Sequence, residues 1–264
     1  MSAAHPRHAF LDHPGPIPFA HRGGADGPAG ENTMSAFKIA VESGYRYLET
    51  DVHATADGVL LAFHDRRLQR VTDTRGRIST LTAAEVATAR VGDEPIPTMA
   101  DLLEAFPEAR FNIDVKEPNA IVPLTALLRD ADAVERVCVS SFSDTRLAAM
   151  RAAFGPELCT SAGPREAFRI WRASRRLKAG ETPDPATLPQ VGAACLQVPP
   201  ALGRIVVVDE RLLAAAHAAG LPVHVWTVNE AADMERLLDL GADGIMTDRL
   251  DTLKTVLTKR GTWS

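Results

Sequence analysis

The chain has 264 residues, of which 45% are hydrophobic, 24% are charged and 5% are aromatic, and its formal net charge is −5. This composition is typical of a globular protein, and no run of about 18 apolar residues is present to cross a bilayer. The negative charge argues against non-specific binding to nucleic acids, which requires a basic surface.

Residues 1–16 are expected to form a flexible leader, because they are rich in proline and lack the apolar segment of a signal peptide. Cys138, Cys159 and Cys195 each lie in an apolar run, and their spacing does not resemble a zinc motif. We therefore expect three inert core thiols in a reducing, cytoplasmic location. The sequence does not indicate an oligomeric state.

The apolar periodicity predicts strands that alternate with helices along the chain. The expected strands are 17–20, 45–52, 111–115, 136–140, 158–161, 194–198, 222–227 and 244–246. The expected helices begin near 31 and end at Gly44, and then occupy 82–90, 98–106, 120–131, 143–154, 164–178, 209–219, 230–239 and 250–258. Asp57-Gly58 also predicts a hairpin that returns antiparallel over 59–63.

Alternating strands and helices indicate a parallel sheet with right-handed crossovers. Eight units in this length favour a TIM (β/α)8 barrel formed by one domain over 17–264, with the extra hairpin strand and an insertion at 179–193 after the fifth strand. A doubly wound open sheet is the alternative. The barrel is favoured because many polar residues end strands, where a barrel gathers them at one mouth: His21, Glu49, Asp51, Asp114, Lys116, Ser140, Ser141, Gln197, Trp226 and Asp248.

Glu49 and Asp51 point to the same side of one expected strand, because side chains alternate along a strand. Two neighbouring carboxylates in an apolar run require a cation, and hard oxygen ligands favour Mg²⁺ or Ca²⁺ over zinc. Asp114 adds a third carboxylate at the end of another strand. The alternative is a pair of solvated acids at a strand end.

His21 and His64 each end an expected strand beside these acids. Histidine titrates near neutral pH and suits an acid/base pair. Arg22 and Lys116 supply cations that fit phosphate oxygens, although Arg22 could instead form a salt bridge with Glu31 or Asp65. A metal, two cations and two histidines together indicate chemistry on a phosphoryl group.

These residues resemble the glycerophosphodiester phosphodiesterase family. The motifs that carry the resemblance are HRG at 21–23, ENT at 31–33, E-x-D-V at 49–52, T-x-D-G at 55–58 and HD at 64–65, followed by FNIDVKE, SSF, VHVWTVN and GADGIMTD in the family's order. The short segment 65–110 is similar to the compact bacterial members, which have no large inserted subdomain.

The resemblance implies a TIM barrel that uses a divalent cation to hydrolyse glycerophosphodiesters to glycerol 3-phosphate and an alcohol. It implies metal ligands at Glu49 and Asp51, and an acid/base pair at His21 and His64. It further implies phosphate contacts and substrate contacts at Arg22, Lys116, Glu31 and Trp226. The family usually has glutamate at Asp114, so the third metal ligand is one methylene shorter here.

Other activities remain open on the sequence. The same machinery serves a lysophospholipase D, or a relative that releases a cyclic phosphate. A non-catalytic binder of phosphorylated ligands is less favoured, because binding alone does not need two proton carriers. We expect a small-molecule phosphodiester substrate and no nucleic-acid partner.

Residues 165–178 interleave arginines with Phe168, Ile170 and Trp171. This pattern allows peripheral contact with an anionic membrane surface. The alternative is an outer barrel helix with a solvated basic face.

Overall fold

The structure is a computed structural model that describes residues 8–25, 30–178 and 180–263. Residues 1–7 of the expected leader and residues 26–29 lie outside these ranges. Eight parallel strands form the centre: β1 (Ile17–His21), β2 (Tyr47–Ala54), β6 (Arg110–Val115), β7 (Val137–Ser140), β8 (Cys159–Thr160), β9 (Leu196–Val198), β12 (Val223–Val225) and β13 (Gly244–Thr247).

The strands follow the order β8-β7-β6-β2-β1-β13-β12-β9 in one curled sheet. Its two edges meet at a parallel bridge between Ser161 and Cys195. There the Ala162 amide donates to the Cys195 carbonyl at 2.8 Å, and the Ala194 amide donates to the Thr160 carbonyl at 2.8 Å. Neighbouring strands are therefore consecutive in the chain, which confirms the predicted TIM barrel rather than a doubly wound sheet.

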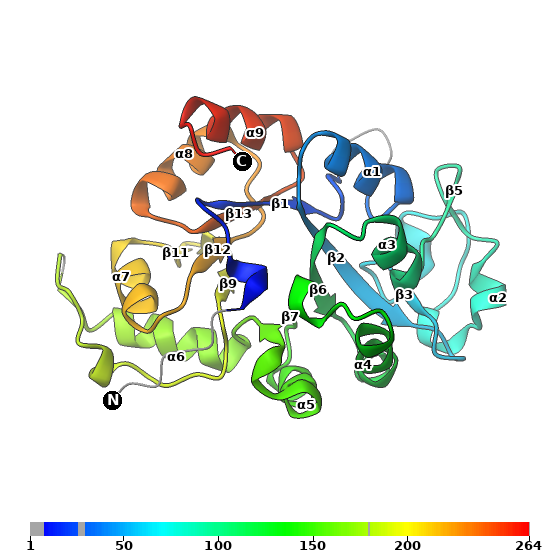
Figure 1. Ribbon diagram of the computed structural model, residues 1–264, viewed down its shortest axis with the longest axis horizontal. Coiled ribbons are helices and arrows are strands. Elements are labelled where there is room, and N and C mark those ends of the chain that lie inside the picture. Colours follow the sequence, from blue (N-terminus) through cyan, green and yellow to red (C-terminus); the bar gives the residue numbers. More distant parts are fainter. Residues whose placement is uncertain (1–7, 26–29, 179, 264) are drawn as a thin grey trace.

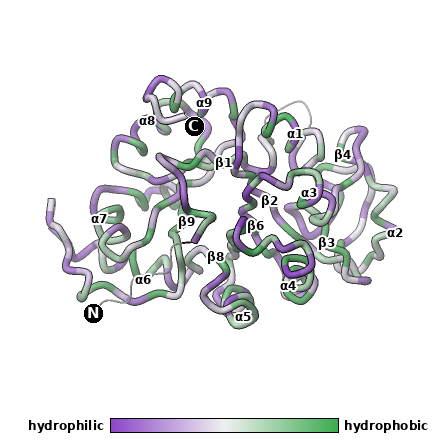
Figure 2. Tube along the Cα trace, in the orientation of Figure 1, coloured by the Kyte–Doolittle hydropathy of each residue, from purple (hydrophilic) through white to green (hydrophobic). Residues whose placement is uncertain are grey.

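Helices surround these strands in Figure 1. They are α1 (Met34–Glu42), α4 (Ile121–Asp130), α5 (Asp144–Phe154), α6 (Pro164–Ser174), α7 (Glu210–Ala218), α8 (Ala231–Leu240) and α9 (Leu250–Lys259). Hydrophobic and hydrophilic residues alternate along them (Figure 2), as expected where one helix face packs on a barrel. The α1 helix begins at Met34, three residues after the expected start, because the Thr33 hydroxyl caps it by accepting from the Ala36 amide.

The predicted hairpin is confirmed, because β3 (Leu60–Ala62) pairs antiparallel with β2. Between β3 and β6 the chain forms α2 (Ala83–Val86), β4 (Arg90–Val91), β5 (Glu94–Pro95) and α3 (Met99–Ala105). The helix expected over 82–90 is thus one turn long, because residues 90–95 form a small antiparallel ribbon instead. These elements lie together at one side of the barrel in Figure 1.

Two differences from the expected elements lie after β8. The helix expected over 164–178 ends at Ser174, and the Pro-rich insertion follows it. A short hairpin, β10 (Ala201–Leu202) with β11 (Ile205–Val206), stands between β9 and α7. The insertion at 179–193 was expected from its proline content, but periodicity does not specify how the backbone between two elements pairs.

The prediction of a flexible leader is wrong for residues 8–16. Phe10 is fully buried, and its ring lies 5.3 Å from that of Tyr47. The Tyr47 hydroxyl donates to the Phe10 carbonyl at 2.9 Å, and Arg110 donates to the Asp12 carbonyl at 2.6 Å. Because Tyr47 and Arg110 begin their strands, this segment covers the N-terminal end of the barrel.

Candidate active site

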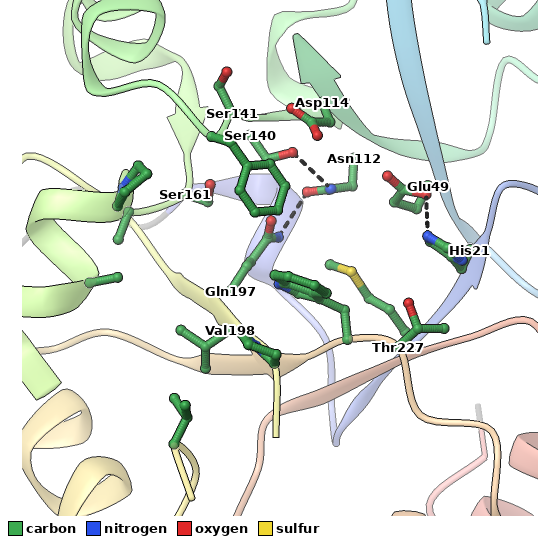
Figure 3. Close-up of a pocket in the computed structure, with 18 of the residues that line it drawn as sticks. His21, Glu49, Asn112, Asp114, Ser140, Ser141, Ser161, Gln197, Val198 and Thr227 are labelled. Carbon is green, nitrogen blue, oxygen red and sulfur yellow. Dashed lines mark hydrogen bonds and ion pairs between the residues drawn. The ribbon is translucent and has the colours of Figure 1, made fainter. Parts of the chain in front are cut away.

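A cavity of about 580 Å³ opens at the C-terminal ends of the barrel strands. In Figure 3, His21 and Glu49 face it from one side, and Ser161, Gln197 and Val198 line the other. The barrel gathers nearly all of the strand-end residues singled out from the sequence, because parallel strands all present their C-terminal ends at one mouth. Those that line the cavity are His21, Arg22, Glu49, Asp51, His64, Asp114, Lys116, Ser140, Ser141, Gln197 and Trp226.

His21 ends β1 and is held from two sides. Its Nδ1 donates to Oδ1 of Asp248 at 2.6 Å, and its Nε2 lies 3.7 Å from Oε2 of Glu49. Burial disfavours the charged imidazole, but Glu49 and Asp248 outweigh it and raise the pKa of His21. At the edge of the cavity, the imidazole therefore holds a proton more readily than a free histidine does.

The turn after His21 has a strained backbone. Arg22 has φ of 52° and Gly23 has φ of 81°. A Cβ on Gly23 would lie 2.9 Å from the Ala36 Cβ, so only glycine fits this position. The turn directs the Arg22 amide to Oε2 of Glu49 at 3.2 Å. It thereby links β1 to the acidic end of β2.

Glu49, Asp51 and Asp114 are each at most 5% exposed. Asp51 and Asp114 are direct neighbours in the pairing of β2 with β6. The Lys116 ammonium lies between them, 2.6 Å from Oδ1 of Asp51 and 2.6 Å from Oδ2 of Asp114. The carboxylate pair Glu49 and Asp51 therefore has a lysine beside it. The sequence around Glu49 and Asp51 does not show this lysine, because Lys116 directly follows a different strand, β6.

The three carboxyls differ in their pKa values. Burial and the neighbouring Asp51 raise the pKa of Glu49 to about 7. Burial also raises the pKa of Asp114, against the effect of Lys116. For Asp51, Lys116 and Arg22 outweigh burial, so its pKa is lowered. Two buried carboxyls therefore lack enough neighbouring positive charge, which is the condition under which a bound cation is stabilising.

Asp114 offers a more direct indication, because its Oδ1 is buried without a hydrogen-bond partner in the described part of the chain. The oxygens of the three acids are not gathered as closely as a coordination shell requires. Among the described residues, only a cysteine cluster brings three metal-ligating atoms within 4.8 Å of one another.

Arg22 extends along the acidic wall. Its Nε lies 3.2 Å from Oδ2 of Asp51, and its Nη1 donates to Oε1 of Glu31 at 3.3 Å. Glu31 also binds Arg70, and these two arginines outweigh burial and lower its pKa. The alternative of an Arg22–Glu31 salt bridge is therefore present, whereas Asp65 pairs with Arg70 instead.

His64 follows β3, and its Nδ1 donates to Oδ1 of Asp65 at 2.6 Å. The buried His53 ring donates through Nε2 to the His64 carbonyl at 3.0 Å. Each cavity histidine therefore has an aspartate that fixes its ring orientation, His21 through Asp248 and His64 through Asp65.

The wall away from the acids is largely apolar. Trp226 contacts Phe142, with ring centroids 5.5 Å apart. Beyond them the cavity extends to α6 and to the β10–β11 hairpin, where Phe168, Trp171, Leu202 and Ile205 line it. One cavity thus joins a charged end to an apolar end.

Sequence reasoning assigned no role to several residues that shape the site. Asp248 was noted only as a strand end, and Asn229 holds it through a 2.9 Å hydrogen bond. Asn112 and Gln197 form the floor, with Gln197 Nε2 donating to Asn112 Oδ1 at 2.8 Å. Asn112 precedes Asp114 by two positions, so the alternation of the strand could have placed it in the barrel interior.

Below this floor lie Cys138, Cys159 and Cys195, whose sulfurs are within 4.8 Å of one another. Cys138 and Cys159 are register partners in β7 and β8. All three are buried free thiols, as predicted.

Comparison with known proteins identifies the family. The model of the glycerophosphoryl diester phosphodiesterase family matches residues 21–252. The chain belongs to this family. The glycerophosphoryl diester phosphodiesterases are phosphoric diester hydrolases and generally depend on a divalent metal. The match confirms the predicted family and enzyme class.

The chain is 39% identical to probable glycerophosphodiester phosphodiesterase 2 of Mycobacterium tuberculosis, over 96% of this chain and 95% of that protein. It is 29% identical to lysophospholipase D GDPD1 of Homo sapiens, over 90% of this chain and 85% of that protein. Among solved structures of the family, a glycerophosphodiester phosphodiesterase from Agrobacterium tumefaciens superposes with a TM-score of 0.74 at 24% identity, covering 92% of this chain and 99% of that one. No helix in the described ranges is long and apolar enough to span a membrane.

Proposed function

We propose that this chain hydrolyses glycerophosphodiesters to glycerol 3-phosphate and an alcohol, with His21 and His64 as its proton carriers. One observation carries the proposal: both histidines, three buried acids and two phosphate-compatible cations line the same cavity. Its relative in Mycobacterium tuberculosis, named for this activity, supports it.

The two histidines suit opposite ends of the reaction. Each has its Nδ1 bound to an aspartate, which leaves Nε2 for the substrate. One imidazole accepts the proton of the attacking hydroxyl, which belongs to water or to the substrate itself. The other donates a proton to the departing alkoxide. Both proton transfers require fixed imidazole orientations, which the hydrogen bonds of His21 to Asp248 and of His64 to Asp65 provide.

Arg22 and Lys116 would bind the phosphate. Both side chains line the cavity and form ion pairs with Asp51, which keep their positive charges within the site. The arginine offers a fork of donors that matches two phosphate oxygens, and the lysine offers a point charge. Glu31 would orient Arg22 and contact the glycerol portion, and Trp226 would pack against the substrate.

Glu49, Asp51 and Asp114 would hold the divalent cation. The buried Asp114 Oδ1 without a partner and the raised pKa values of Glu49 and Asp114 support this set. All three donors are hard carboxylate oxygens, which suit Mg²⁺ or Ca²⁺. When bound, such an ion supplies Lewis-acid stabilisation of the charge on the phosphate oxygens.

The direct test is an assay for glycerol 3-phosphate released from glycerophosphocholine. Release that stops on addition of EDTA and returns with Mg²⁺ or Ca²⁺ is the expected result. Product release that persists unchanged in EDTA would contradict the metal assignment. Failure to release product from any glycerophosphodiester under metal-replete conditions would favour a non-catalytic ligand binder.

A second candidate substrate is a lysophospholipid, cleaved by the same residues in a lysophospholipase D reaction. The apolar end of the cavity, formed by Phe142, Phe168, Leu202 and Ile205, favours it, because a small polar alcohol needs no such wall. Comparing kcat/KM for glycerophosphocholine with that for lysophosphatidylcholine decides between them, and the same assay detects a cyclic phosphate as final product.

The cytoplasm remains the proposed location, supported by the three free thiols.

A further inference from the structure

The exposed large apolar side chains of the described chain are concentrated at the cavity mouth. They are Ile39, Val41, Val122, Phe142, Phe168, Leu202, Ile205 and Val206. Four of them, Phe142, Phe168, Leu202 and Ile205, line the cavity, and Val206 is adjacent to Ile205 in β11. Apolar groups gathered on one face mark an interaction site, whereas isolated ones are ordinary.

The β10–β11 hairpin is the most exposed part of this group. Leu202, Ile205 and Val206 are 62%, 55% and 56% exposed. The base of the hairpin is closed by the Val207 and Val208 amides, which donate to the Pro200 carbonyl at 3.0 Å and 3.2 Å. A hairpin that served only as a connection would carry polar residues here, so its apolar surface indicates a partner.

Basic side chains surround the same mouth. On α6, Arg165 and Arg172 lie three positions before and four after the exposed Phe168, so all three share one helix face. Arg204 occupies the turn of the hairpin. These three arginines are exposed and form no ion pair with another described residue, whereas the nearby Arg175 pairs with Asp209. A chain of net charge −5 therefore has a local positive surface at its active-site mouth.

We propose that this rim, defined as Phe168, Leu202, Ile205 and Val206 with Arg165, Arg172 and Arg204, docks on a lipid bilayer that contains anionic lipids. Apolar side chains at the level of the acyl boundary, with arginines beside them for the phosphates, are the arrangement of a peripheral membrane surface. The charge favours a bilayer over a protein partner with an apolar surface alone. Docking would place the cavity over the bilayer, with its apolar wall continuous with the lipid.

The consequence of docking, which is access to lipid phosphodiesters, rests on the proposed function. The docking itself can be measured without any catalytic assay. Sedimentation with vesicles of phosphatidylcholine alone and of phosphatidylcholine with phosphatidylglycerol is the first measurement. We expect binding to the anionic vesicles that weakens as salt is added, because salt screens exposed charges. Absence of binding to both compositions would overturn the proposal.

Matched variants identify the surface. Leu202→Ser with Val206→Ser removes apolar contacts, and Arg165→Glu with Arg172→Glu reverses the charge; each pair should weaken anionic-vesicle binding at least about tenfold. The controls are Val122→Ser, which changes a side chain 77% exposed on α4, and Arg46→Glu at the opposite end of the barrel. Equal losses in rim and control variants would show that binding does not use the rim and would overturn the assignment.

Activity separates this inference from the proposed function. For Arg204→Glu with Val206→Ser, neither of which lines the cavity, the ratio of activity on lysophospholipid in vesicles to activity on water-soluble glycerophosphocholine should fall about tenfold. An unchanged ratio would contradict docking through the hairpin. A wild-type protein that binds vesicles but cleaves neither substrate would instead contradict the proposed function and leave the docking result standing.

Discussion

Nδ1 of His21 and Oδ1 of Asp248 are 2.6 Å apart, although 227 positions separate the two residues in the chain. The contact arises because β1 pairs with β13, so the last strand of the barrel places its end beside the first. Asp248 is in turn held by Asn229, which donates to its Oδ2 and accepts from its amide. This network fixes the plane of the His21 ring relative to Glu49.

Replacing Asp248 should therefore impair His21 without removing it. We expect Asp248→Asn to lower kcat at least about tenfold, as part of the contribution of general acid–base catalysis. Asp248 also raises the pKa of His21, so the limb of the pH–rate profile that His21 governs should shift to lower pH. The control is Asp243→Asn, which disturbs a comparable pair with His217 outside the cavity. A lower kcat with an unmoved pH profile would show a structural effect only.

His21→Ala and His64→Ala should each lower kcat by roughly 10²–10⁴-fold, because each removes one proton carrier from the cavity. Steady-state assays on glycerophosphocholine measure the loss, and His217→Ala serves as the control at a histidine 42% exposed outside the site. Near-normal turnover in either cavity variant would remove that histidine from the mechanism.

The proposed metal site can be tested at Asp114, where the family usually has glutamate. Asp114→Asn removes one carboxylate charge, so the concentration of Mg²⁺ or Ca²⁺ needed for half-maximal activity should rise at least about tenfold. Asp114→Glu keeps the charge and should need much less. Metal titrations followed by thermal unfolding give an independent reading, because a bound ion stabilises the fold. Identical metal dependence in wild type and Asp114→Asn would exclude this residue as a ligand.

His217 gives the fold a pH dependence of its own. Its Nε2 lies 2.7 Å from Oδ2 of Asp243, a hydrogen bond that raises the pKa of His217 despite burial. A raised folded-state pKa means that this stabilisation is complete below the unfolded value of about 6.5 and is lost as pH rises through the folded value. Both side chains are over a third exposed, so solvent screening keeps the contribution below about 1 kcal/mol.

Urea unfolding at several pH values measures this effect. Relative to wild type, His217→Gln should be less stable in mildly acidic solution, and the difference should shrink in alkaline solution. A difference that grows with pH would have the wrong sign for a protonated histidine paired with an aspartate.

The three cysteines should not react with a thiol reagent in the native state. Burial raises the pKa values of Cys138 and Cys159, whereas hydrogen bonds with these two thiols lower the pKa of Cys195. Each of the three thiols is at most 1% exposed, so it is the lack of access that prevents reaction with the reagent. We expect no labelling in the folded protein and three labelled thiols after unfolding without reductant. Fewer than three would indicate that a disulfide or a bound metal holds the cluster.

The barrel could be predicted from the sequence because strand and helix periodicities are local. The strands containing Glu49, Asp114 and Ser140 were expected within a few residues of their observed bounds, and parallel pairing then requires their C-terminal ends to meet. The candidate site was predicted for the same reason, since most of its residues end strands. Residues 8–16 were misjudged, because Phe10 is apolar in a segment without periodicity and only the closed barrel offers a surface to bury it.

By itself, the sequence determined the fold class, the family and the chemical types gathered at one mouth. Alternation along strands and the E-x-D and HD motifs carry that information in short stretches of chain. Only the tertiary structure decided that Lys116 lies between Asp51 and Asp114, that Asp248 holds His21, and that Leu202 and Phe168 line one cavity. Those relationships depend on strand register and on how loops fold back over the barrel, and both are set by packing between segments far apart in the chain.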